Sequence, residues 1–105
     1  MKNQPRKVPF EHIQDLVGSL KFVFARVNNP DGTPSTTTAC WAYLPSGFQV
    51  GYGASGCVNP ADYKQETGEK HAKERCITDA TDKLWEFEGY CMKQTGKHTG
   101  EHNES

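Results

Sequence analysis

The sequence predicts an α+β fold with an N-terminal helix, a three-stranded antiparallel meander and a long C-terminal helix packed on the sheet. Three observations favour this fold: an apolar stripe with helical spacing near the N-terminus, three short alternating segments joined by turns, and a long helical pattern near the end. With 105 residues the chain has the length of one domain. We therefore expect one modest core.

The first helix is expected from Pro9 to Leu20, after a polar and flexible segment at residues 1–8. Proline suits the first turn of a helix, because the amide proton that it lacks would have no partner there. Apolar side chains then recur at steps of three and four residues, as on one face of a helix: Phe10, Ile13, Leu16, Val17 and Leu20.

Three strands are expected at Lys21–Val27, Thr36–Leu44 and Phe48–Ala54. Their short connections, one with an Asp-Gly turn signal, favour an antiparallel meander. The alternation places Cys40 and Trp41 on opposite faces of the second strand. In the third strand it groups Phe48, Val50, Tyr52 and Ala54 against Gln49, Gly51 and Gly53.

The long helix is expected to begin near Asn59-Pro60, because asparagine caps free amides and proline fits the first position. Gly68 is expected to kink the chain. From Glu69 to Met92 an apolar stripe should face the sheet: Ala72, Cys76, Ala80, Leu84, Phe87 and Cys91. Residues 94–105 are predicted to form a disordered polar tail, so that a single domain spans residues 9–93.

Composition argues against nucleic acid as a partner and against a location in the membrane or outside the cell. Twelve Lys and Arg residues against thirteen Asp and Glu residues give a net charge of −1, which argues against nucleic acid as the main partner. No run of about 18 apolar residues and no apolar signal core is visible, so we expect no membrane association and a cytoplasmic location. The four cysteines should then be reduced, core-filling thiols.

Two patterns resemble sites that the context does not support. Residues 51–56 match GxGxxG, but a dinucleotide fold needs a second parallel strand after the helix, and only the polar tail follows. We interpret these glycines as allowing the strand to bend or another backbone to pack closely. A general anion site where Ser55–Asn59 meets the helix start remains open.

A zinc site could be assembled from Cys76, Cys91, His98 and His102, but no paired-cysteine knuckle precedes the histidines. Both thiols also lie on the expected core face. We therefore expect no metal and no cofactor. Because no histidine is placed beside a thiol and no acidic pair stands out, we also expect no catalytic residues and a protein that is not an enzyme.

Large amphipathic aromatic side chains are abundant for so short a chain. If the long helix covers the Cys40 face of the sheet, Trp41 and Tyr43 point outward unless the first helix covers them. Exposed aromatic side chains commonly anchor interfaces or stack on bases. The candidate residues for binding a partner or ligand are Trp41, Tyr43, Tyr52, Ser55, Asn59, Tyr63, Arg75, Trp85 and Tyr90.

Two further motifs resemble those of a known family. Residues 56–63 (GCVNPADY) are similar to an "ACVDPANF"-like helix entry, and residues 83–90 (KLWEFEGY) to a "KLWPLEGY"-like helix end. Over residues 10–92 the chain thereby resembles the small phage proteins named for gene product 49 of phage N4 and gene product 66 of phage Sf6. Asn59 stands where the family often has aspartate, and Glu86 where it often has proline, which favours an unbroken helix here. The resemblance implies a phage protein made in a bacterial cytoplasm, with no established activity.

Three hypotheses about function follow. The first is a non-enzymatic phage accessory protein that binds and inhibits or redirects a host factor, in host takeover or anti-defence, through the aromatic sheet face or an oligomeric assembly. The second is an oligomeric sponge for a nucleotide-type immune signal, in which the Ser55–Asn59 loop, Arg26, Arg75 or a lysine, and an aromatic ring hold the phosphate and the base. The third is a nucleic-acid-binding regulator, against which the near-neutral charge argues.

Overall fold

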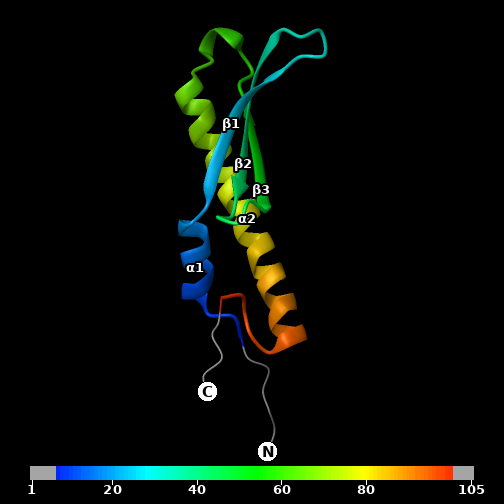
Figure 1. Cartoon of the computed structure of the whole chain (residues 1–105). Coiled ribbons are helices and arrows are strands. Elements are labelled where there is room, and N and C mark those ends of the chain that lie inside the picture. Colours follow the sequence, from blue (N-terminus) through cyan, green and yellow to red (C-terminus); the bar gives the residue numbers. More distant parts are fainter. Residues whose placement is uncertain (1–6, 101–105) are drawn as a thin grey trace, which may run out of the picture.

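The computed structural model describes residues 7–100 and has the predicted architecture (Figure 1). The elements are α1 (Phe10–Gly18), β1 (Lys21–Asn28), β2 (Pro34–Tyr43), β3 (Gln49–Gly56), a 3-10 turn η1 (Pro60–Asp62) and α2 (Gln65–Thr95). The strands form an antiparallel sheet in the order β1-β2-β3, and α2 packs on it, mainly against β3. The N-terminal helix, the meander and the long C-terminal helix are thus confirmed.

The pairing of the strands determines which side chains share a face. Phe24 lies opposite Cys40, which lies opposite Gly53 on the other side. Val23, Trp41 and Tyr52 form the neighbouring row. Because successive residues of a strand point to opposite faces, the first row faces α2 and the second faces away from it.

Glycines of β3 allow α2 to approach the sheet closely. A Cβ atom at Gly51 would lie 2.7 Å from the Cβ atom of Ala80, and one at Gly53 would lie 2.6 Å from the carbonyl oxygen of Ala72. The helix therefore rests almost directly on the β3 backbone. The GxGxxG match thus reflects close packing of the helix on the strand, which is one of the two alternatives that the sequence leaves open for these glycines.

The core between α2 and the sheet is small and built largely from short side chains. Its buried members are Ile13, Leu20, Cys40, Ala42, Val50, Ala72, Cys76, Ala80 and Leu84. The simple alternation predicted for β3 is wrong at Val50, which is 1% exposed whereas Tyr52 is 44% exposed. The cause is an irregularity: Ala42 pairs with Gly51 but Tyr43 pairs with Gln49, so Val50 is the extra residue of a bulge.

The helix entry differs from the prediction. The Asn59 side chain does cap a turn, accepting a hydrogen bond from the Ala61 amide at 3.0 Å, but this turn is the short η1. Tyr63 and Lys64 are extended, and α2 starts only at Gln65. Gly68 therefore lies in the first turn of a continuous helix and does not kink it.

The buried stripe of α2 also differs from the prediction in its second half. It continues in steps of four from Leu84 to Glu88 and Met92, rather than to Phe87 and Cys91. A step of four residues advances slightly more than one helical turn, so this stripe winds around α2. Phe87 is 44% exposed and contacts Phe48 edge-on, with the ring centroids 5.9 Å apart.

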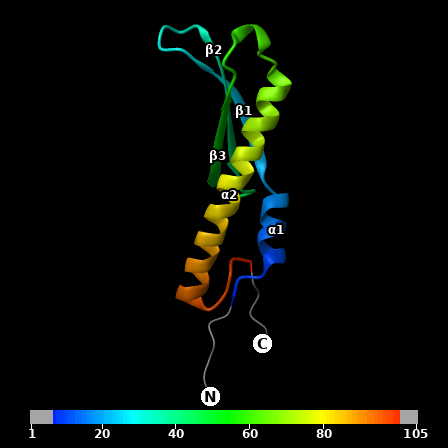
Figure 2. The ribbon, with the colours of Figure 1, turned by 180° about the vertical axis from the view of Figure 1, so that it is seen from behind.

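The lower half of α2 extends past the sheet, and α1 lies beside it there (Figures 1 and 2). After α2 ends at the left-handed Gly96, the chain returns towards α1, and Thr99 contacts Glu88. Part of the predicted tail is therefore packed, because the Thr99 amide donates a hydrogen bond to the buried Glu88 carboxylate. Residues 1–6 and 101–105, where the rest of the predicted flexible ends fall, lie outside the described residues. Within residues 7–100 no helix is long and apolar enough to cross a membrane.

Alanine substitutions at two glycines test the close approach of α2 to β3. We expect Gly53→Ala to lower the free energy of unfolding by about 3 kcal/mol, because the new methyl group meets helix backbone that cannot yield. Gly89→Ala, within α2, has nothing within 4 Å and should instead stabilise the protein by about 1 kcal/mol. Urea denaturation measures both values, and equal effects of the two substitutions would contradict the packing.

Candidate functional site

The face of the sheet turned away from α2 carries the main group of predicted binding residues. We call this the outer sheet face; by strand register it comprises Lys21, Val23, Ala25, Ala39, Trp41, Tyr43, Gln49, Tyr52 and Ala54. The Trp41 and Tyr52 rings pair across the strands with their centroids 5.5 Å apart. Figure 1 views the sheet from this side, with α2 behind it, while α1 lies along the lower part of α2 and not over the sheet.

This face combines apolar area with little charge. Val23 is 50% exposed and Tyr52 is 44% exposed, and Lys21 is the one charged residue among those that define the face. Ordinary soluble surfaces are rich in charge, whereas the centres of protein interfaces are enriched in aromatic residues and depleted of charged ones. The outer sheet face thus has the composition of an interface.

A second predicted group meets at the entry to α2. A pocket of about 160 Å³ is lined there by Thr36, Ser55, Gly56, Cys57, Asp62, Tyr63, Lys64, Thr67, Gly68 and His71. The Arg26 guanidinium lies 4.1 Å from the centroid of the Tyr63 ring, and the hydroxyl groups of Thr38 and Tyr63 are 3.2 Å apart. Ser55 and Tyr63 are therefore brought together, beside an arginine.

The other predicted site residues are placed elsewhere. The Asn59 side chain caps η1, and Arg75 donates a hydrogen bond to the Ala54 carbonyl at 2.8 Å, at the β3 edge. Trp85 and Tyr90 are 38% and 68% exposed, but they lie on α2, in the other layer of the fold. The nine residues therefore do not form one site.

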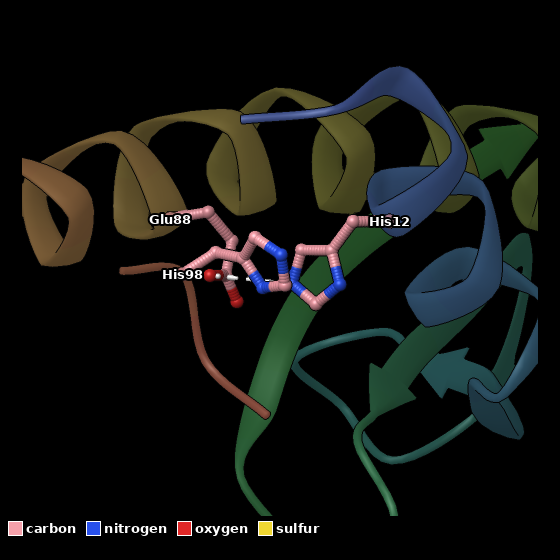
Figure 3. Close-up of side chains that lie close together, drawn as sticks. All are labelled: His12, Glu88 and His98. Carbon is pink, nitrogen blue, oxygen red and sulfur yellow. Dashed lines mark ion pairs between the residues drawn. The ribbon is translucent and has the colours of Figure 1, made fainter. Parts of the chain in front are cut away.

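A cluster that the sequence prediction missed joins α1, α2 and the segment after α2 (Figure 3). It consists of His12, Glu88 and His98, whose ligating atoms all lie within 4.8 Å of one another. Glu88 is only 3% exposed, and its oxygens accept hydrogen bonds from the Thr99 amide at 2.7 Å and from the Thr99 hydroxyl. The His12 Nε2 atom lies 3.4 Å from Glu88 Oε1, and the His12 and His98 rings are stacked with centroids 3.8 Å apart.

The charge of Glu88 is stabilised in spite of its burial. Burial alone would raise the pKa of this carboxyl, but the two Thr99 hydrogen bonds and the nearby His12 outweigh it, so the pKa lies below its ordinary value. Glu88 thus stays ionised at neutral pH. One signal in the sequence could have revealed this buried carboxylate. Glu88 lies four residues after the buried Leu84, and a charged side chain at such a core position needs a partner.

The cysteines take no part in this cluster. Cys40 and Cys76 are buried in the core, and burial raises the pKa of the Cys76 thiol to about 12, so it is protonated at neutral pH. Cys91 donates a hydrogen bond to the Lys97 carbonyl oxygen at 3.3 Å. The set of four zinc ligands weighed from the sequence is therefore not assembled by its thiols, and His102 lies outside the described residues.

The sequence profile of the phage protein (N4 Gp49/phage Sf6 gene 66) family matches residues 8–95. The match contains every helix and strand of the fold, so the chain belongs to this family and is a phage protein. No curated protein and no solved structure matches the chain.

The lowered pKa of Glu88 predicts how stability depends on pH. A carboxyl whose pKa is lower in the folded state stabilises the protein above its unfolded pKa of about 4.3, and this contribution is lost as the pH falls through the folded pKa. Glu88→Gln should therefore cost about 1–3 kcal/mol at pH 7 and progressively less below about pH 4. Urea denaturation at several pH values measures this, with the exposed Glu86→Gln as the control. A cost of Glu88→Gln that does not change with pH would contradict the assignment.

Proposed function

We propose that the protein is a non-enzymatic phage accessory protein that acts in the cytoplasm of the bacterial host. In this proposal it binds a host protein through the outer sheet face and thereby inhibits or redirects that protein. The observation that carries the proposal is the Trp41–Tyr52 pair, with a half-buried Trp41 and an exposed Tyr52, on a nearly uncharged sheet face that no other described helix or strand covers.

The size of the core supports binding as the role of this face. The buried core uses mostly alanine, cysteine and valine-sized side chains, while Val23 and Tyr52 of the outer sheet face remain about half exposed. Monomeric proteins seldom leave contiguous apolar patches of this kind in water unless they bind something. The high pKa of Cys76 supports the non-enzymatic part of the proposal, because a protonated buried thiol is a poor nucleophile.

A host protein fits this face better than nucleic acid does. A nucleic-acid surface would carry several lysine or arginine side chains to pair with phosphates, and Lys21 alone lies among the residues of the outer sheet face. Aromatic rings without surrounding charge instead suit the apolar centre of a protein interface. A second copy of the chain is the competing occupant, which sedimentation separates from a host partner.

Matched lysine substitutions test the proposal. Tyr52→Lys changes the outer sheet face, and Tyr90→Lys changes an exposed tyrosine of α2 on the other layer. We expect Tyr52→Lys to weaken binding of the captured host protein by at least about tenfold, the usual effect of losing an aromatic anchor, and Tyr90→Lys to leave binding unchanged. The affinities are measured with the purified host partner after its capture from lysate.

The effect of each variant on the host should parallel its binding of the host protein. Expression of the wild type and of Tyr90→Lys should change host growth or defence, and expression of Tyr52→Lys should not. The proposal is wrong if both variants bind equally. It is also wrong if sedimentation shows that the outer sheet face only joins two copies of the chain, with no host protein bound.

A second candidate function, sequestration of a nucleotide-type signal, is favoured by the pocket at the entry to α2. Tyr63 offers a ring, and the adjacent Arg26 and Lys64 offer positive charge for phosphate. At about 160 Å³ the pocket is smaller than the roughly 300 Å³ at which small-molecule sites begin, so a second copy would have to complete it. This requirement agrees with an oligomeric sponge.

Calorimetry against cyclic nucleotides and ADP-ribose derivatives tests this candidate. We expect binding to one member of the panel that is weakened at least tenfold by Arg26→Gln and that is accompanied by a stable oligomer in sedimentation. Arg75→Gln, whose guanidinium already bonds to Ala54, serves as the control. Flat heats across the whole panel would eliminate the candidate.

A further inference from the structure

We propose that His12, Glu88 and His98 bind one divalent transition-metal ion, for which zinc is the best fit, and that the ion holds α1 and the segment after α2 against α2. This inference is independent of the proposed binding function. It replaces the expectation that the chain binds no metal.

The donor set is that of a zinc site. Two imidazoles and one carboxylate are the ligands of His₂Glu zinc centres, in which water or another group takes the fourth position. Their ligating atoms lie within 4.8 Å of one another, although they come from three separate segments of the chain (Figure 3). Nitrogen donors favour zinc and its neighbours over magnesium and calcium, which prefer oxygen alone.

The His12 Nε2 atom is the second observation that indicates a ligand. It is buried and has no hydrogen-bond partner, whereas nearly all buried polar atoms in proteins have one. Its distance of 3.4 Å from Glu88 Oε1 is longer than a good hydrogen bond. It equals the separation expected for two ligands that each lie about 2.0–2.1 Å from one tetrahedral ion, which is about 3.4 Å.

Glu88 is held as a metal-binding carboxylate normally is. The Thr99 amide and hydroxyl each donate to one of its oxygens, which fixes the orientation of the group. Each carboxylate oxygen can accept more than one such interaction, so a metal can bind as well. Such supporting hydrogen bonds around a metal ligand commonly set its affinity.

His98 is the ligand that must move. Its ring is stacked on that of His12 at an interplanar angle of 27°, so the two rings do not converge on one point (Figure 3). His98 follows the left-handed Gly96 on a short segment after α2 and is not a member of the hydrophobic core, and its Nδ1 atom lies 2.8 Å from the Thr99 carbonyl oxygen. Metal binding should therefore unstack the two imidazoles, and this change can be observed.

The test is a zinc titration of the full chain after chelator treatment, followed by calorimetry. We expect one zinc ion per chain, with affinity reduced at least about a hundredfold in His98→Ala and in Glu88→Gln, and about 10–100-fold in Thr99→Val. His71→Ala is the matched control, because His71 is a half-exposed histidine of α2 that pairs with Glu74. It should bind zinc like the wild type.

Two further measurements separate this site from cysteine ligation. The cobalt-substituted protein should lack the sulfur-to-metal charge-transfer band, and Cys57→Ser/Cys91→Ser should bind zinc normally. Zinc should raise the thermal midpoint of the wild type but not that of His98→Ala, which alters a side chain outside the core and should still fold. The proposal is overturned if the wild type binds no zinc, if His98→Ala binds as tightly as the wild type, or if the cysteine variant loses binding.

Discussion

The direct contact between the β3 backbone and α2 is the constraint on which the rest of the structure depends. There is no room for side chains at Gly51 and Gly53, and the helix residues that face them have small side chains: Ala72, Cys76 and Ala80. Dispersion contacts accumulate where two backbones approach so closely. One helix can therefore hold a three-stranded sheet, although the core contains few large side chains.

The same contact determines which surfaces remain for function. A helix that lies on the glycine face turns the row of Val23, Trp41 and Tyr52 away from the core. It also extends past the end of the sheet, where α1 and the segment after Gly96 pack against its lower half. The outer sheet face and the His12–Glu88–His98 cluster are thus two consequences of one packing arrangement.

The sequence predicts the elements well because their signals are local. Apolar spacing indicates α1 and α2, and short turns indicate the meander. It does not predict the bulge at Val50 or the start of α2 at Gln65, because strand register and the extended Tyr63 depend on tertiary contacts. It also misses Glu88: the position four residues after Leu84 indicates burial, but the partners that make a buried carboxylate tolerable there, Thr99 and His12, are distant in the chain.

The orientation of the two sheet faces is tested most directly by nuclear Overhauser contacts in the full-length protein. The structure predicts contacts from the Gly53 α protons to Ala72 and Cys76, and from the Trp41 ring to Val23 and Tyr52, with none from that ring to α2. Contacts between the Trp41 ring and the α2 residues Ala72, Cys76 or Ala80 would show that the aromatic row faces the helix, and would contradict the account.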